Sequence, residues 1–262
     1  MMLSEIQKEK LRHIISISLN KAEKNWDNGG SLLIESVNKG IGIESRDGFV
    51  MDSAEPSKIP GHDIVTDAET VIDEFVAFVA DMRDSTKHLL CAISDKKAKV
   101  SGLQRVYYET SALLPSLGFI VSEENGSVTE YLGDGALALF RINPDDRSEA
   151  IYAAHRAAKN TIGDARTIIN EILYERYNLP AIDLGVGLAT SKALVTLVGL
   201  PPNMHPKAFG ECVFRATKLS CGKNEIISDD NLKSMWPTAK GGTLRFISKK
   251  FKELNGYVLA TS

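Results

Sequence analysis

Cysteine is scarce in this sequence and follows no metal-binding or disulfide pattern. The three cysteines, Cys91, Cys212 and Cys221, are far apart, and none belongs to a Cys-x-x-Cys or Cys/His spacing. A disulfide framework and a structural zinc site are therefore excluded as the basis of the fold. The same usage is typical of a reducing compartment, so we expect a cytoplasmic location.

The sequence also lacks an excess of charge of one sign and any long apolar run. With 31 Lys and Arg against 34 Asp and Glu, the formal net charge is -3. This balance argues against a nucleic-acid or acidic-membrane surface and indicates a small molecule or a protein as the partner. No apolar run reaches the roughly 18 residues that span a bilayer, and the amino terminus has the charge pattern of an amphipathic helix. We therefore expect no membrane segment.

Two regions of the 262-residue chain differ in composition. Residues 1–70 begin with the amphipathic pattern and continue into stretches rich in Gly, Asn, Ser and Pro, which predict loops: NWDNGG, NKGIGIES and SAEPSKIPGHD. We interpret this region as an extension without a core of its own. Residues 71–262 alternate strand and helix patterns, and form the predicted main domain.

The main domain opens with the apolar run EFVAFVAD, which predicts a buried strand ending at Asp81. A helix is expected next, with Ser85 or Thr86 as its N-cap. A second, longer helix is predicted from about residue 99 to 117, where Gly118 ends it.

The rest of the domain continues the alternation. GFIVSEENGSVTEYL and ALALF predict a hairpin, residues 147–177 a long helix, AIDLGVGLA and ALVTLVGL a second hairpin that turns at residues 190–192, and ECVFRATKLS a further helix. The order β-α-α-β-β-α-β-β-α-β predicts an α+β fold with a mainly antiparallel sheet flanked by helices.

An acid occupies the tip of the first hairpin, within EYLGDGALALF. If this hairpin neighbours the strand that ends at Asp81, Asp134 and Asp81 lie at the same sheet edge. Two carboxylates there repel each other unless a cation binds between them, and hard divalent ions bind through carboxylates and substrate phosphates. Each acid alone is also typical of a turn or a cap, so their joint placement is what favours a metal site. Ser85 and Thr86, at the following helix start, are candidate phosphate-binding residues.

These motifs resemble those of the class III nucleotide cyclases, the adenylate and guanylate cyclase superfamily. FVADMRDST and EYLGDGALALF are similar to that family's two metal strands, LGVGLATSKALVTLVG to its Gly-containing hairpin, and FGECVFRATKL to the helix beside the triphosphate. The resemblance covers roughly residues 75–228. It implies a ferredoxin-like catalytic core and a homodimer with sites at the interface.

The resemblance also implies a reaction and its metal ligands. Two ions per site, Mg²⁺ or Mn²⁺, would be held by Asp81, Asp134 and the carbonyl of Met82. The implied reaction is cyclisation of a nucleoside triphosphate by attack of its 3′-hydroxyl on the α-phosphorus, with release of pyrophosphate. No protein nucleophile is required.

Two departures from the family pattern concern catalysis and base recognition. Phe214 and Lys218 stand where the family usually has Asn and Arg, so Lys218, or Arg215 in its place, is the implied transition-state cation. Glu130 and Lys207 stand at the base-binding positions. A carboxylate and an ammonium match the N3–H and O4 of uracil, or the N1–H and O6 of guanine.

The extension and the altered base positions together resemble the bacterial pyrimidine cyclases of Pycsar antiphage signalling. This resemblance implies UTP, in preference to CTP, as the substrate, and a separate effector protein that responds to the cyclic product. A guanylate or adenylate cyclase stays open, since Glu130 stands where guanylate cyclases carry Glu. A catalytically degenerate nucleotide-binding module also stays open, because of Phe214 and Lys218. A diguanylate cyclase is excluded, since its Gly-Gly-acid-Glu-Phe motif is missing.

Overall fold

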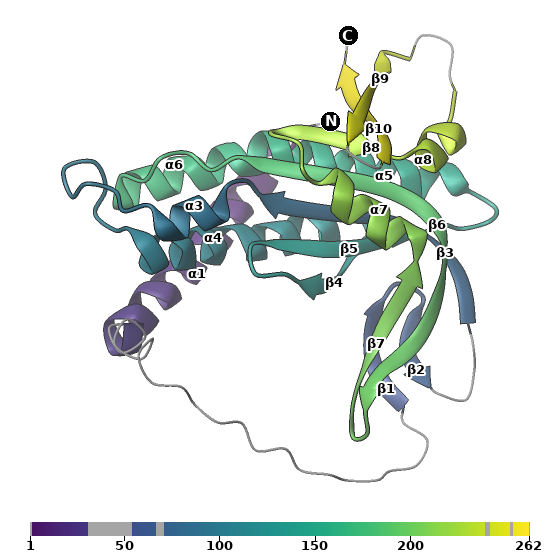
Figure 1. Cartoon of the computed structure of the whole chain (residues 1–262), viewed down its shortest axis with the longest axis horizontal. Coiled ribbons are helices and arrows are strands. Elements are labelled where there is room, and N and C mark those ends of the chain that lie inside the picture. Colours follow the sequence, from purple (N-terminus) through teal and green to yellow (C-terminus); the bar gives the residue numbers. More distant parts are fainter. Residues whose placement is uncertain (1, 31–53, 67–70, 239–241, 252–253, 262) are drawn as a thin grey trace.

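The structure, a computed structural model, describes residues 2–30, 54–66, 71–238, 242–251 and 254–261. Its main sheet is built around β3 (Val71–Met82), which pairs antiparallel with β6 (Leu184–Leu200) on one side and β5 (Gly135–Arg141) on the other. The strand order is β4-β5-β3-β6-β8-β10-β9, and β7 pairs with the far end of β6 (Figure 1). The other strands of this sheet are β4 (Ser127–Tyr131), β7 (Asn203–Gly210), β8 (Glu225–Ser228), β9 (Leu244–Phe251) and β10 (Leu254–Thr261).

The pairing confirms the predicted fold class. β6 and β8 run parallel, whereas the other strand pairs in the described residues are antiparallel. The predicted order of elements holds as far as β8. It continues with a short helix, α8 (Asp230–Met235), and the β9–β10 hairpin, which the sequence analysis did not predict.

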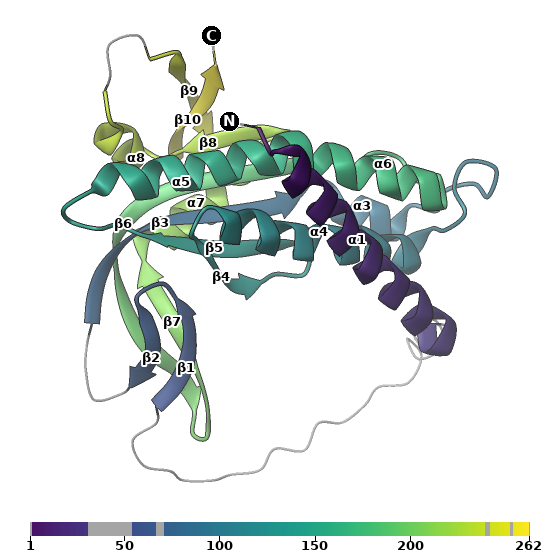
Figure 2. The same ribbon diagram turned by 180° about the vertical axis from the view of Figure 1, so that it is seen from behind.

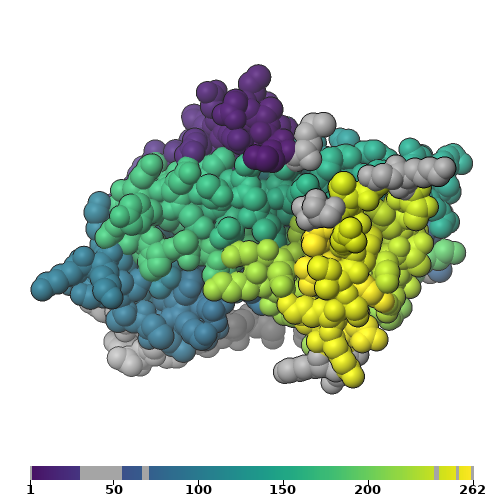
Figure 3. All heavy atoms as spheres, turned by 90° about the horizontal axis from the view of Figure 1, so that it is seen from above, coloured from purple at the N-terminus to yellow at the C-terminus, as the bar shows by residue number. Residues whose placement is uncertain are grey.

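Helices cover the two faces of the sheet unequally. Four helices lie on one face, and α7 (Glu211–Leu219) packs on the other (Figures 1 and 2). The four are α1 (Glu5–Asn25), α4 (Gly102–Glu123), α5 (Arg147–Asn160) and α6 (Arg166–Tyr177). A π-helical turn, Thr161–Ala165, joins α5 to α6, so the predicted long helix is confirmed with one irregular turn. Figure 3 shows α1 lying across the outside of this layer.

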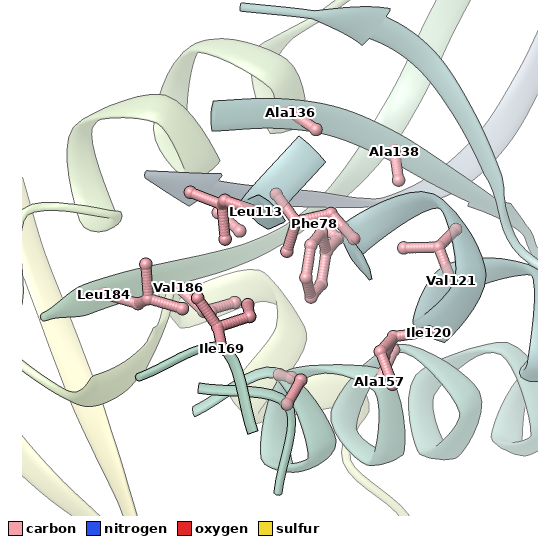
Figure 4. Close-up of a cluster of buried hydrophobic side chains, with 14 of the residues drawn as sticks. Phe78, Leu113, Ile120, Val121, Ala136, Ala138, Ala157, Ile169, Leu184 and Val186 are labelled. Carbon is pink, nitrogen blue, oxygen red and sulfur yellow. The ribbon is translucent and has the colours of Figure 1, made fainter. Parts of the chain in front are cut away.

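β3 is buried on both faces because its alternate side chains enter two different cores. Phe78 and its same-face neighbours join the larger core under the four helices, where it lies among side chains from α4, α5, β5 and β6 (Figure 4). Phe75, Ala77 and Val79 join the smaller core, to which α7 contributes Cys212 and Ala216. This double burial explains the continuous apolar run in the sequence.

The extension is partly regular structure. α1 has no separate core, because Leu11, Ile15 and Leu19 are buried in the larger core of the main domain. Residues 54–63 of the SAEPSKIPGHD stretch, expected as a loop, belong to a hairpin of β1 (Ala54–Ile59) and β2 (His62–Thr66). Trp26–Gly30, within NWDNGG, form a π-helical turn after α1. The NKGIGIES stretch lies outside the described residues.

The predicted end of the second helix at Gly118 is wrong, since α4 continues to Glu123. Burial of Ile120 and Val121 against the sheet favours the continuation. Gly118 serves close packing instead: a Cβ there would lie 2.6 Å from the hydroxyl of Tyr131 on β4. Because α4 continues to Glu123, the first hairpin is shorter than predicted, and its outer strand, β4, begins only at Ser127.

The predicted second hairpin at residues 190–192 is also wrong. β6 runs without interruption through this segment and turns only after Leu200, to return as β7. The polar side chains that resemble a turn find partners within the fold. The Thr190 hydroxyl donates to the Phe75 carbonyl at 2.9 Å, and the Ser191 hydroxyl accepts from the Cys212 amide at 2.9 Å.

The described helices include none that is both long and apolar enough to cross a membrane.

Asp229 is a fully buried acid between β8 and α8. Its Oδ1 accepts from the Leu232 amide at 2.9 Å, whereas Oδ2 is buried and has no hydrogen-bond partner among the described residues. Burial raises the pKa of Asp229 from 3.8 to about 6. The folded protein therefore binds this proton more tightly than the unfolded chain does.

Because the pKa of Asp229 is raised in the folded protein, we expect the free energy of unfolding to fall as pH rises from about 4 to about 6. Because over this range the folded state still holds a proton that the unfolded chain has already released, the unfolding free energy contributed by this group falls by on the order of 3 kcal/mol. Asp229→Asn keeps the Oδ1 acceptor and removes the titration. Urea unfolding at several pH values between 4 and 7 should show a flatter pH dependence in this variant. Asp145→Asn, at an exposed acid that does not act on Asp229, is the control and should retain the wild-type slope.

Candidate active site

Asp81 and Asp134 come to neighbouring positions where β3 ends and β5 begins. Asp81 pairs with Gly135 in the β3–β5 ladder, and the Met82 amide donates to the Asp134 carbonyl at 3.0 Å. Gly135 permits this close approach, because a Cβ there would lie 2.2 Å from the Ala80 carbonyl oxygen. The fold thus brings the backbones of the two acids to one edge of the sheet.

The Arg83 guanidinium lies on the two β3 groups that the sequence analysis assigned to metal. Its Nη2 pairs with the Asp81 carboxylate and lies 3.5 Å from the Met82 carbonyl oxygen. Its Nε is buried without a hydrogen-bond partner among the described residues. The carboxylate and carbonyl therefore already hold a cationic group between them. Oxygen donors of this kind fit a hard divalent ion.

The predicted N-cap role of Ser85 and Thr86 is wrong. α3 (Ser85–Leu90) begins after Asp84, which has a left-handed backbone with φ of 61° and makes no side-chain cap. The Ser85 hydroxyl instead donates to the Asp134 carboxylate, and Thr86 is exposed. Ser85 therefore orients one of the two acids.

A buried ionic group that the sequence analysis missed holds α3 against α4. None of the α3 residues is fully buried. His88 Nδ1 lies 2.9 Å from Glu109 Oε2, and the Arg105 Nε donates to Glu109 Oε1 at 2.8 Å. Glu109 is fully buried, and the two partners bond to both of its carboxylate oxygens. The spacing of Arg105 and Glu109, four residues apart on one helix, was the available signal.

Glu130 and Lys207 form an ion pair that joins two strands distant in sequence. The Lys207 ammonium on β7 lies 2.6 Å from Glu130 Oε1 on β4, and each side chain is about one-third exposed. Tyr131, the next residue on β4, places its hydroxyl against Gly118 of α4. A carboxylate and an ammonium are thus held side by side, within reach of solvent.

α7 presents one free cation and one paired cation. Lys218 is exposed and forms no ion pair with the described residues. Arg215 is paired within the helix, because its Nε donates to Glu211 Oε1 at 2.7 Å. Phe214 is 61% exposed, and its ring packs edge-on against that of Phe209 on β7 at 6.2 Å between centroids. Of the two candidate cations, Lys218 is therefore the one available to a ligand.

Glycines on β6 hold α7 directly on the sheet. A Cβ at Gly185 would lie 2.0 Å from the Ser220 carbonyl oxygen, and one at Gly187 would lie 2.0 Å from the Ala216 carbonyl oxygen. The helix that carries Lys218 therefore packs backbone to backbone on β6.

Solved structures of nucleotide cyclases share this fold. The guanylyl cyclase Cya2 superposes with a TM-score of 0.58 at 14% identity, over 73% of this chain and 93% of that one. The adenylyl cyclase CyaB from P. aeruginosa gives 0.58 at 16% identity, over 74% and 97%. The guanylate cyclase domain of RhGC from Catenaria anguillulae, solved in complex with GTP, gives 0.52 at 16% identity, over 74% and 98%. The chain therefore has the class III cyclase catalytic fold.

Sequence similarity to curated proteins is weaker. A terminal-differentiation-specific adenylate cyclase of Dictyostelium discoideum is 23% identical over 150 residues. The match covers 57% of this chain but only 6% of that much longer protein. No protein-family model matches the chain.

Proposed function

We propose that this chain is a nucleotide cyclase that converts a nucleoside triphosphate, preferentially UTP, into its 3′,5′-cyclic monophosphate and pyrophosphate. One observation carries the proposal: within a class III cyclase fold, the β3–β5 edge joins Asp81 to the Asp134 turn, and a cationic group lies between Asp81 and the Met82 carbonyl. Guanylyl and adenylyl cyclases are among the proteins similar in fold or sequence.

The residues of the site take separate roles in this reaction. Asp81, Asp134 and the Met82 carbonyl would hold two ions, Mg²⁺ or Mn²⁺, and Ser85 would keep the Asp134 carboxylate in position. The bound ions would lower the pKa of the substrate 3′-hydroxyl and balance the charge of the triphosphate. Lys218 would donate to the phosphate oxygens, where negative charge increases in the transition state.

We propose that two copies of the chain assemble to complete each site. Phe209 and Phe214 form an exposed aromatic pair on β7 and α7, and Leu200, at the end of β6, is 82% exposed. Apolar side chains of this size are typical of the core of a protein interface. In the dimer, the metal ligands of one protomer would face the base-binding residues and Lys218 of its partner.

The base preference rests on Glu130 and Lys207. The carboxylate would accept the ring N–H of the base, and the ammonium would donate to the adjacent carbonyl. Uracil and guanine both offer this pair of groups, so guanosine triphosphate is the second candidate substrate. Together with the resemblance to Pycsar cyclases, the pair supports UTP and a cyclic pyrimidine messenger read by a separate effector protein.

The proposal predicts cyclic UMP as the main product when the protein is incubated with ATP, GTP, CTP and UTP in separate reactions with Mn²⁺. Products are identified by mass spectrometry, and the Asp134→Asn variant gives the background. A dominant cyclic GMP or cyclic AMP product would assign the chain to the purine cyclases. If the protein binds triphosphates tightly but forms no cyclic product in any reaction, the degenerate nucleotide-binding module is favoured. Phe214 and Lys218, in place of the usual Asn and Arg, suggested that alternative.

A further inference from the structure

β1, the first strand of the β1–β2 hairpin, lines a cavity beside the Glu130–Lys207 ion pair. A cavity of about 290 Å³ lies between β1, β4 and β7. Its lining includes Lys58 and Ile59 of β1, Glu130 of β4, and His205 and Lys207 of β7. The volume lies at the lower end of the range for small-molecule sites, which suits a single base better than a whole nucleotide. The views from both sides show the hairpin beside the arm formed by β6 and β7 (Figures 1 and 2).

Buried contacts fix the hairpin in this place. Ile59 and Val65 are 2% and 5% exposed, and both belong to the smaller core of the sheet. At the turn, His62 Nε2 lies 3.0 Å from the Asp73 carboxylate on β3, which also accepts from Arg141 Nε at 2.6 Å. The β1–β2 hairpin is therefore packed into the domain and held in a fixed position.

Lys58 brings an unpaired cation to this cavity. It lies on β1 and is exposed, and its ammonium forms no hydrogen bond or ion pair with the described residues. Lys207, by contrast, is already paired with Glu130. The cavity thus has one carboxylate acceptor and two ammonium donors. His205 also lines it, but a neutral imidazole both donates and accepts, so it favours neither kind of base group.

We propose that Lys58 is a specificity-determining residue that selects uracil over guanine. This inference rests on the proposed function and deepens it. The pairing edge of uracil presents an acceptor, a donor and an acceptor: O4, N3–H and O2. Lys207, Glu130 and Lys58 would match these three groups in order. Guanine presents O6, N1–H and an amino group, so its third position would set an amino donor against the Lys58 ammonium. The Glu130–Lys207 pair alone would accept either base, and Lys58 would be the residue that discriminates between them.

The inference is tested by binding, independently of turnover. The probes are 3′-deoxyuridine and 3′-deoxyguanosine triphosphates with Mn²⁺, which lack the attacking hydroxyl and cannot cyclise. Lys58→Met keeps the aliphatic stem and removes the donor. We expect it to weaken binding of the uridine probe about tenfold, while the guanosine probe binds as well as before or better. Lys58→Glu replaces the donor by an acceptor and should shift the preference further toward the guanosine probe.

Controls separate specificity from general charge effects and from loss of fold. Lys96→Met removes an exposed lysine in the segment between α3 and α4, and should leave the ratio of the two affinities unchanged. Equal weakening of both probes by Lys58→Met would mean that Lys58 only attracts the triphosphate, and would overturn the inference. Unchanged affinities would overturn it as well. Thermal unfolding verifies that each variant is folded.

The outcome is distinguishable from a failure of the proposed function. The products of the wild-type protein decide whether it is a uridylate cyclase, whereas the change in the affinity ratio from wild type to variant decides the role of Lys58. A wild type that makes cyclic UMP with a ratio insensitive to Lys58 would leave the proposed function intact and remove only this inference.

Discussion

Asp134→Asn is expected to reduce cyclase turnover by about 10³-fold or more while leaving the fold intact, since metal-based stabilisation of the transition state is worth several kcal/mol. The amide is nearly isosteric with the carboxylate and still accepts from the Ser85 hydroxyl. It carries no charge to hold a divalent ion, however. Asp134 lies on the turn before β5 and is not fully buried, so the substitution leaves the core unchanged.

Two measurements accompany the loss of activity. Titration calorimetry with Mn²⁺ and 3′-deoxyuridine triphosphate should show weakened metal binding, and thermal unfolding should match wild type within about 2 °C. Asp84→Asn is the matched control. Asp84 lies three residues beyond Asp81, is exposed, and has the left-handed backbone that Asn tolerates. Retention of wild-type turnover by Asp134→Asn would refute the metal assignment.

Mixing two inactive variants is expected to restore activity if each site is shared between protomers. Asp134→Asn removes a proposed metal ligand, and Lys218→Ala removes the proposed phosphate-binding cation, which should cost about 10² to 10³-fold in turnover. In a dimer with one copy of each, one site carries both changes and the other carries neither. Random exchange of protomers therefore predicts about one quarter of wild-type activity in an equal mixture.

The control pair for this experiment places both changes on the same half of the site. Asp81→Asn mixed with Asp134→Asn should show no recovery, because every site then lacks one metal ligand. Activity in the Asp134→Asn and Lys218→Ala mixture that does not exceed the mean of the two separate variants would show that each chain acts alone. Size-exclusion chromatography with light scattering measures the dimer directly.

The meeting of Asp81 and Asp134 at one edge of the sheet was predictable from sequence because its signals are local. A strand that ends in an acid and a Gly-Asp-Gly turn each restrict the backbone within a few residues. The pairing of Asp81 with Gly135 is a long-range property, and the sequence analysis took the neighbouring of the two strands only as a condition, which the structure meets. The role of Arg83 was not anticipated, because no local pattern indicates where a long flexible side chain will place its charge.

The cavity beside Glu130 and Lys207 shows the opposite case. SAEPSKIPGHD has the composition of a loop, yet it contributes β1, the turn and the start of β2, because Ile59 and the following strand find a place in the smaller core. This contact depends on the whole fold and overrides local propensity. Lys58 could therefore not be placed next to Glu130 and Lys207 from sequence alone. In β6, likewise, polar Thr190 and Ser191 resemble a turn, but their hydroxyl groups bond within the folded domain.

The glycines beneath α7 determine which movements can control this protein. Since the carbonyls of Ala216 and Ser220 lie directly over Gly187 and Gly185, α7 has no freedom to approach the sheet, and a shift along β6 would break a close backbone fit. The backbone that carries Lys218 is thus fixed relative to β6. If the proposed dimer forms, a signal that changes its activity is therefore expected to act by rotating or separating whole subunits rather than by moving α7 within one of them.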